Sequence, residues 1–97
     1  MMKTFTMHSD PGHGWLEVTI QEARQALLDT SDFSQFSFMR GEKLYLEEDC
    51  DATLFIRCWE HHVGPVTIAE KYSRYDHWIR SLTRIKTDIF IDDEIIF

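Results

Sequence analysis

Residues 3–22 read KTFTMHSDPGHGWLEVTIQE, and from them we predict two strands followed by the start of a helix. The first six of these residues alternate, with Phe5 and Met7 on one face, as in a half-buried strand. The Asp-Pro-Gly of residues 10–12, followed by a second glycine, favours a turn. A second alternating strand over 15–20 comes next, so the two strands are expected to form a hairpin.

The hairpin is expected to lead directly into a helix over 21–28. Thr19 and Glu22 have the spacing of a capping box, in which each side chain accepts a hydrogen bond from the other residue's backbone N–H. Ile20, Ala23 and Leu27 recur at helical spacing and predict the buried stripe of this helix. The polar residues after Leu28 bond to their own backbone readily, so they are expected to end it.

The remainder of the chain predicts further strands and helices. Strands are expected at 36–39, 44–47 and 66–68, with a hairpin turn over 40–43. A second helix is expected after Asp51, ending at Gly64, with a stripe formed by Leu54, Phe55, Cys58 and Trp59. A third helix is predicted from the 3.6-residue spacing of Tyr75, Trp78, Ile79, Leu82 and Ile85.

These elements predict one α+β domain over residues 1–97. Its core is expected to be a small antiparallel sheet of about four to five strands, with two to three helices packed on one face. The apolar end of the chain, residues 86–97, is interpreted as a C-terminal strand, a docking tail or a self-association segment. A structural role as a homodimer built through this segment is one alternative for the whole chain.

The charge of the chain limits the classes of partner. Seventeen acidic residues against ten basic ones give a net charge of −7, which disfavours direct binding of nucleic acid and favours a basic partner surface. Net charge that serves only solubility is the simpler alternative. We find no apolar run long enough for a membrane helix or a signal peptide, so a cytoplasmic location is expected. Cys50 and Cys58 are accordingly expected to be thiols.

The sharpest cluster is the run of carboxylates Glu47, Glu48, Asp49 and Asp51, which repel one another unless they are solvated or matched by an outside cation. Asp49 or Asp51 is expected to cap the second helix, which gives part of the cluster a structural role. The rest is interpreted as a surface that imitates the phosphate spacing of DNA and binds a basic cleft. The acids that extend this candidate surface are Asp29, Asp32, Asp92, Asp93 and Glu94.

No catalytic or cofactor motif is recognised in the chain. His8, Asp10 and His13 surround a turn and suggest a metal site, but their spacing matches no zinc or nuclease signature, so a shaped turn is the preferred interpretation. His61 and His62 are expected near the C-terminal end of the second helix, where cationic imidazoles interact favourably with the helix dipole. Zinc binding together with Cys58 is the alternative. We therefore predict no catalytic residue, no metal and no cofactor, with a small metal-dependent enzyme as the alternative from another class.

Two stretches resemble a group of small proteins encoded by bacteriophages and other mobile elements. They are DPGHGWLEV at 10–18 and YLEEDCDA at 45–52, and the resemblance covers roughly residues 3–85. Within this group the chain resembles type I-F anti-CRISPR inhibitors. That resemblance implies stoichiometric blocking of a CRISPR surveillance complex in the cytoplasm of the bacterial host, by mimicry of DNA at its basic DNA-binding surface. It carries over no individual site residue, and an anti-restriction or other phage regulatory binding protein is the alternative.

Overall fold

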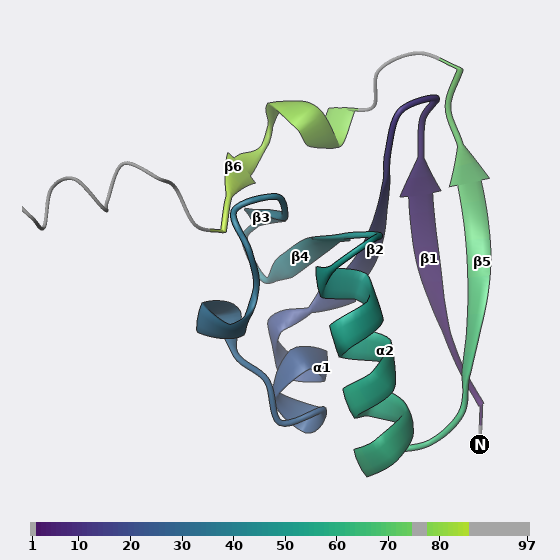
Figure 1. Cartoon of the computed structure of the whole chain (residues 1–97), viewed down its shortest axis with the longest axis vertical. Coiled ribbons are helices and arrows are strands. Elements are labelled where there is room, and N and C mark those ends of the chain that lie inside the picture. The colour runs from purple at the N-terminus through teal and green to yellow at the C-terminus, as the bar shows by residue number, and fades with distance from the viewer. Residues whose placement is uncertain (1, 75–77, 86–97) are drawn as a thin grey trace, which may run out of the picture.

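The computed structural model describes residues 2–74 and 78–85, and its fold is α+β, as predicted. Its elements are β1 (Lys3–Ser9), β2 (Gly14–Thr19), α1 (Ile20–Gln25), η1 (Thr30–Asp32), β3 (Phe38–Arg40), β4 (Lys43–Glu47), α2 (Asp51–His62), β5 (Val66–Tyr72), η2 (Trp78–Ser81) and β6 (Thr83–Arg84), where η marks a 3₁₀ helix. Figure 1 shows them along the chain. The predicted tail 86–97 lies outside the described residues.

The sheet is mixed and has six strands in the order β5-β1-β2-β4-β3-β6, so the prediction of four to five antiparallel strands is wrong in both respects. The two predicted hairpins, β1–β2 and β3–β4, are confirmed as antiparallel pairs. However, β5 pairs parallel with β1 over its whole length, from Lys3 opposite Val66 to Ser9 opposite Tyr72. The cause is the crossover: α2 returns along the sheet after β4, so β5 must run in the same direction as β4 and β1.

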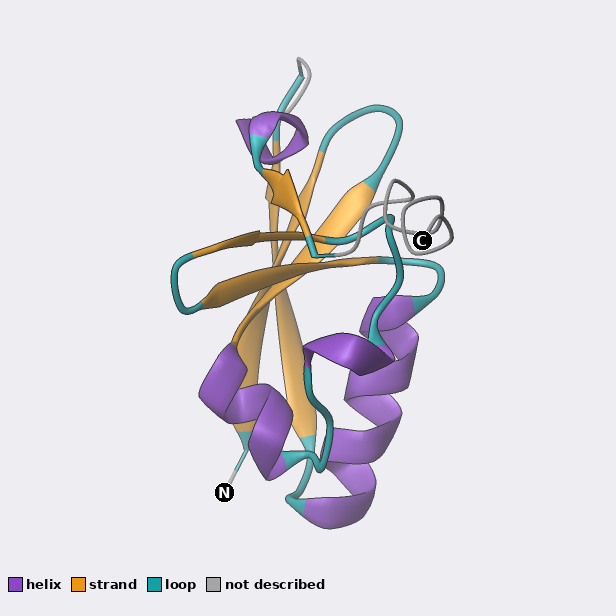
Figure 2. Ribbon diagram, turned by 90° about the vertical axis from the view of Figure 1, so that its left-hand side faces the viewer, coloured by secondary structure: helices purple, strands orange, loops and turns teal. Residues whose placement is uncertain are grey.

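Both faces of the central strands are buried. Leu16 and Leu46 point to the face covered by α1 and α2, where they join a core with Phe55. The neighbouring residues Trp15 and Tyr45 point to the other face and form a second, smaller core with η2 and β3. The helices α1 and α2 lie side by side on one side of the sheet (Figures 1 and 2), so the prediction of helices on one face is confirmed for these two.

The predicted third helix is wrong in the part that the structure describes. Only η2 is helical there, and Thr83 and Arg84 form β6, which pairs antiparallel with β3. Tyr75 lies outside the described residues. Ile79 is completely buried against the second face of the sheet, and the backbone of β6 pairs with the backbone groups at the edge of β3. Two tertiary contacts therefore override a helical spacing of apolar residues.

The boundaries of two further strands differ from the prediction. The third strand begins at Phe38 instead of residue 36, which leaves the Phe36 side chain exposed. The fifth strand is longer than the predicted 66–68, because it follows β1 up to Tyr72. In each case the partner strand, and not the local sequence, sets the end of the element.

Helix α1 confirms its predicted capping box and ends earlier than predicted. The Glu22 N–H donates to Thr19 Oγ1 at 3.0 Å, and the Thr19 N–H donates to the Glu22 carboxylate at 2.9 Å. The helix ends at Gln25, and Leu27 adopts a left-handed φ of 66° with its side chain 70% exposed, so its predicted place in the buried stripe is wrong. The Leu28 N–H donates to the Ala23 carbonyl at 2.9 Å, as in a Schellman motif.

Leu27→Gly is expected to raise the free energy of unfolding by about 0.5 to 1 kcal/mol. Leucine pays a steric cost in the left-handed region that glycine avoids, and the exposed side chain contributes little packing. Urea denaturation measures the gain. Leu27→Ala is the matched control, because it removes the side chain but keeps Cβ; a gain of the same size in both variants would contradict the steric explanation.

Candidate functional site

The acidic run divides into buried and exposed carboxylates. Asp51 is only 3% exposed, and its Oδ2 accepts hydrogen bonds from the Ser34 N–H and the Ser34 hydroxyl, both at 2.8 Å, and from the Ser37 hydroxyl. The expectation that all four carboxylates are solvated or matched from outside is therefore wrong for Asp51. The side chain joins the loop before β3 to the start of α2.

The predicted cap of α2 is also wrong. The N-cap residue is Cys50, which makes no capping hydrogen bond through its side chain, and Asp51 is the first residue of the helix. Asp51 remains in the first turn, where a carboxylate complements the helix dipole. Asp49 instead donates its backbone N–H to Glu47 Oε1 at 3.1 Å, and the residue is exposed.

Glu47 is the second buried carboxylate, at 7% exposure. Burial raises the pKa of Glu47, and the nearby charges of Asp49 and Glu48 add to this effect, while the backbone N–H groups of Asp49 and Cys50 act in the opposite direction. Within the residues that the structure describes, no cation forms an ion pair with Glu47. The group is therefore poorly placed to contact a flat basic partner surface, although it faces a hollow.

The exposed carboxylates of the predicted acidic surface lie on two segments within the described residues. Glu48 and Asp49 are exposed between β4 and α2, and Asp29 and Asp32 are exposed around η1. Asp29 accepts the Ser31 N–H at 2.8 Å, and Asp32 accepts the Asp29 N–H at 2.9 Å, so both acids also cap η1. Asp92, Asp93 and Glu94 lie outside the described residues.

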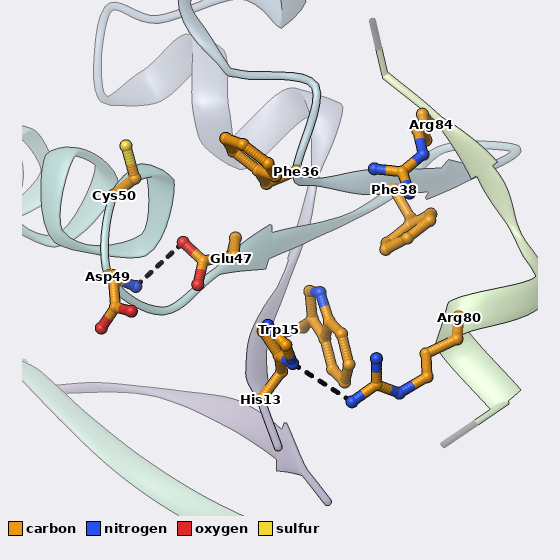
Figure 3. A pocket seen from close by; sticks show the side chains of 9 residues that line it. All are labelled: His13, Trp15, Phe36, Phe38, Glu47, Asp49, Cys50, Arg80 and Arg84. Atoms are coloured by element: carbon orange, nitrogen blue, oxygen red, sulfur yellow. Dashed lines mark hydrogen bonds between the residues drawn. The ribbon is translucent and has the colours of Figure 1, made fainter. Parts of the chain in front are cut away.

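Glu47 and Asp49 form, with the exposed thiol of Cys50, one side of a hollow of about 520 Å³ (Figure 3). The size is that of a small-molecule site. The hollow opens between the end of β4 and the segment that contains η2 and β6. Part of the predicted acidic cluster thus lines a cavity instead of a convex surface.

Aromatic side chains form the middle of the hollow. Trp15 and Phe38 are buried and meet edge to face, with ring centroids 6.2 Å apart. Phe36 is 55% exposed and presents its ring to solvent beside them. A large exposed ring next to a buried aromatic pair offers apolar area that a bound molecule would cover.

Basic side chains form the opposite side. Arg80 lies over the Trp15 ring at 5.2 Å and binds both carboxylate oxygens of Asp10, at 2.8 and 2.9 Å. Arg84 lies over the Phe38 ring at 5.1 Å and donates to the Gln35 carbonyl at 2.8 Å. Among the described residues, no carboxylate pairs with Arg84. The hollow therefore has one acidic side and one basic side.

The residues around the first turn, for which a metal site was the less favoured interpretation, have structural contacts. Asp10 Oδ1 accepts the N–H groups of Gly12 and His13 at 3.0 Å each, which shapes the turn, and the carboxylate also binds Arg80. His8 is buried and its Nε2 lies 2.8 Å from the Glu17 carboxylate. No group of three metal-ligating side chains gathers in the described part of the chain.

The sequence prediction missed most of the residues that line the hollow. Trp15, Phe38, Arg80 and Arg84 were not singled out, and the two arginines fell within the predicted third helix. One signal was available: Trp15 and Leu16 are adjacent large apolar residues in a strand, which indicates that both faces of that strand are covered. It predicts a second core but does not identify what covers it.

Glu47→Gln is expected to change the pH dependence of stability. The pKa of Glu47 in the folded chain lies above its ordinary value of 4.5. Protonation of Glu47 therefore stabilises the fold, and this contribution is fully present at pH values below 4.5. The contribution is lost as the pH rises through the folded pKa. The variant does not titrate here, so its stability relative to the wild type should increase between about pH 4 and pH 7. Urea denaturation over this range tests it, with the exposed Glu60→Gln as control; equal slopes for both variants would contradict the prediction.

No helix within residues 2–74 and 78–85 is long and apolar enough to cross a membrane. The two predicted thiols, Cys50 and Cys58, are both free. Against known proteins, no family model, no curated protein and no solved structure matches this chain.

Proposed function

We propose that this chain is a non-catalytic inhibitor in the cytoplasm of a bacterial host, where it binds the basic DNA-binding surface of a nucleic-acid-targeting defence complex. A type I-F CRISPR surveillance complex is the partner to test first. The observation that carries the proposal is the placement of the exposed carboxylates. Glu48 and Asp49 lie beside the start of α2, and the hydrogen bonds of Asp51 connect that start to the loop that follows Asp32.

The electrostatics support an acidic face on these two segments. Hydrogen bonds from the Ser31 hydroxyl and N–H lower the pKa of Asp29, so this carboxylate is charged at neutral pH. The whole chain carries −7, which favours encounter with a basic surface. Glu47 and Asp51 are buried and take no part in this face, which is now limited to Asp29, Asp32, Glu48 and Asp49 among the described residues.

The test measures displacement of a labelled target duplex from the purified type I-F surveillance complex by fluorescence anisotropy. The wild-type chain is expected to release the DNA stoichiometrically, less well at high salt. The double variant Glu48→Lys with Asp49→Lys should raise the half-inhibitory concentration about tenfold or more, since exposed charges steer and orient the encounter.

The matched control is the double variant Glu60→Lys with Glu70→Lys. Both residues are exposed, on α2 and β5, and the variant changes the net charge by the same amount. Full inhibition by this control would support a local acidic face. An equal loss of inhibition in both double variants would reject a local acidic face and would mean that net charge alone accounts for the inhibition. No displacement by the wild type would reject the CRISPR complex, and the same assay on a restriction enzyme would then test the anti-restriction alternative.

A further inference from the structure

We propose that the hollow binds a free cytidine monophosphate, whose base carries an exocyclic amine. In this arrangement the base covers Phe36, the amine donates to the Glu47 carboxylate, and the phosphate binds Arg84. The inference is independent of the proposed function, because it rests on the inside of the hollow and not on the exposed acidic face.

Glu47 is the group in the hollow that would accept a hydrogen bond from a ligand. Glu47 is only 7% exposed and lines the hollow, and among the described residues its carboxylate has the backbone N–H groups of Asp49 and Cys50 as donors and no cation as a partner. A buried carboxylate is costly unless hydrogen-bond donors surround it. The exocyclic amine of cytosine, whose usual carboxylate partner in proteins is Glu or Asp, supplies such a donor without adding a charge.

Arg84 is the group in the hollow that would bind the anionic group of a ligand. Among the described residues, its guanidinium has one hydrogen bond, to a neutral backbone carbonyl, and no carboxylate pairs with it. A guanidinium has a planar array of donors that matches a phosphate. Arg80 is already compensated by the fully buried Asp10 carboxylate, so Arg84 is the better site for a phosphate.

Phe36 provides the surface for the base. Its ring is large, exposed and placed between the acidic and basic sides of the hollow (Figure 3). Stacking of a base on an aromatic side chain is favourable and removes apolar area from water. A volume of about 520 Å³ is sufficient for one nucleotide.

The separation of the two charged sides favours a nucleotide over an amino acid. An amino acid also offers a donor, an anion and, in tryptophan, a flat ring, but its ammonium and carboxylate share one carbon. A nucleotide places the amine of its base and its phosphate at opposite ends of the molecule, as the two sides of the hollow require. A nucleic-acid strand is disfavoured because a chain of charge −7 repels a polyanion.

Isothermal titration calorimetry with CMP, UMP, cytidine and L-tryptophan tests the assignment. CMP is expected to bind, and UMP should bind about tenfold more weakly because a carbonyl replaces the amine that faces Glu47. Cytidine should lose a similar factor because it lacks the phosphate. In a second measurement, CMP should slow alkylation of Cys50, which lines the hollow, and leave the rate at Cys58 unchanged as an internal reference.

Three variants assign the contacts. Arg84→Met keeps an apolar stem over Phe38 and should reduce the CMP affinity about tenfold, while the exposed Arg57→Met on α2 should not. Glu47→Gln should remove the preference for CMP over UMP, and Glu60→Gln should retain it. Phe36→Ala alters an exposed side chain and so should leave the fold intact. It should reduce the affinity for CMP and UMP by the same factor.

Absence of CMP binding at millimolar concentration would overturn the proposal. Equal affinity for CMP and UMP would overturn the role of Glu47, and tryptophan binding without nucleotide binding would reassign the hollow to amino acids. Tighter binding of a single-stranded oligocytidylate than of CMP would overturn the assignment to a free nucleotide. Folding of every variant is verified by circular dichroism, so that a loss of affinity reports the contact and not the fold.

Discussion

Asp51→Ala is expected to lower the free energy of unfolding by about 3 kcal/mol, a large part of the total stability of a domain of this size. The buried carboxylate accepts from the Ser34 N–H, the Ser34 hydroxyl and the Ser37 hydroxyl. Removing it leaves these donors without their acceptor, and each buried unpaired donor costs about 1–3 kcal/mol, less where water can reach it. Urea denaturation followed by tryptophan fluorescence measures the loss.

Two variants separate this effect from charge. Asp49→Ala removes a carboxylate two residues away that is exposed, so it should change stability by less than about 0.5 kcal/mol. Asp51→Asn keeps one acceptor oxygen and should lose about half as much as Asp51→Ala. Equal losses for Asp49→Ala and Asp51→Ala would mean that the buried hydrogen bonds of Asp51 do not determine its contribution to stability.

Asp10→Ala is expected to cost a similar amount, about 3 kcal/mol, and to release η2 from the sheet. The fully buried carboxylate holds the β1–β2 turn through the N–H groups of Gly12 and His13, and it holds η2 through Arg80. Arg80 is partly exposed, so water compensates part of its lost pairing. Hydrogen exchange should therefore accelerate at Ile79 and Leu82 more than in α2.

Arg80→Ala is the partner variant for this prediction. It leaves Asp10 bonded to the turn, so it should destabilise the chain less than Asp10→Ala while releasing η2 to the same extent. A double-mutant cycle then gives the coupling between the two side chains. Coupling near zero, together with unchanged exchange at Ile79, would show that the apolar packing of Ile79 alone holds η2 in place.

Several elements of the fold were predictable because their causes are local. The capping box needs only Thr19 and Glu22 three residues apart, and the β3–β4 turn needs only a glycine, Gly41, which adopts a φ of 59°. The stripe of α2 was correct for three of its four residues: Phe55 and Trp59 are buried and Cys58 packs partly buried against the core, but Leu54 is exposed. Spacing locates a helical face well and its edges poorly.

The failures share a different cause, which is contact between distant parts of the chain. Helical spacing in 78–85 gave way to pairing with β3, and β5 took its direction from a crossover whose target strand no local pattern specifies. The early end of α1 arises where Leu27 accepts a left-handed backbone so that Leu28 can be buried.

The sequence by itself determined the α+β class, the two hairpins, the capped start of α1 and the excess of negative charge. Only the tertiary structure decided which acids are charges on a surface and which are acceptors in the interior. Asp51 meets Ser34 across 17 residues of sequence, and Asp10 meets Arg80 across 70. The sequence does not identify the partner of a carboxylate, because its burial and hydrogen bonding are determined by the segments that fold against it.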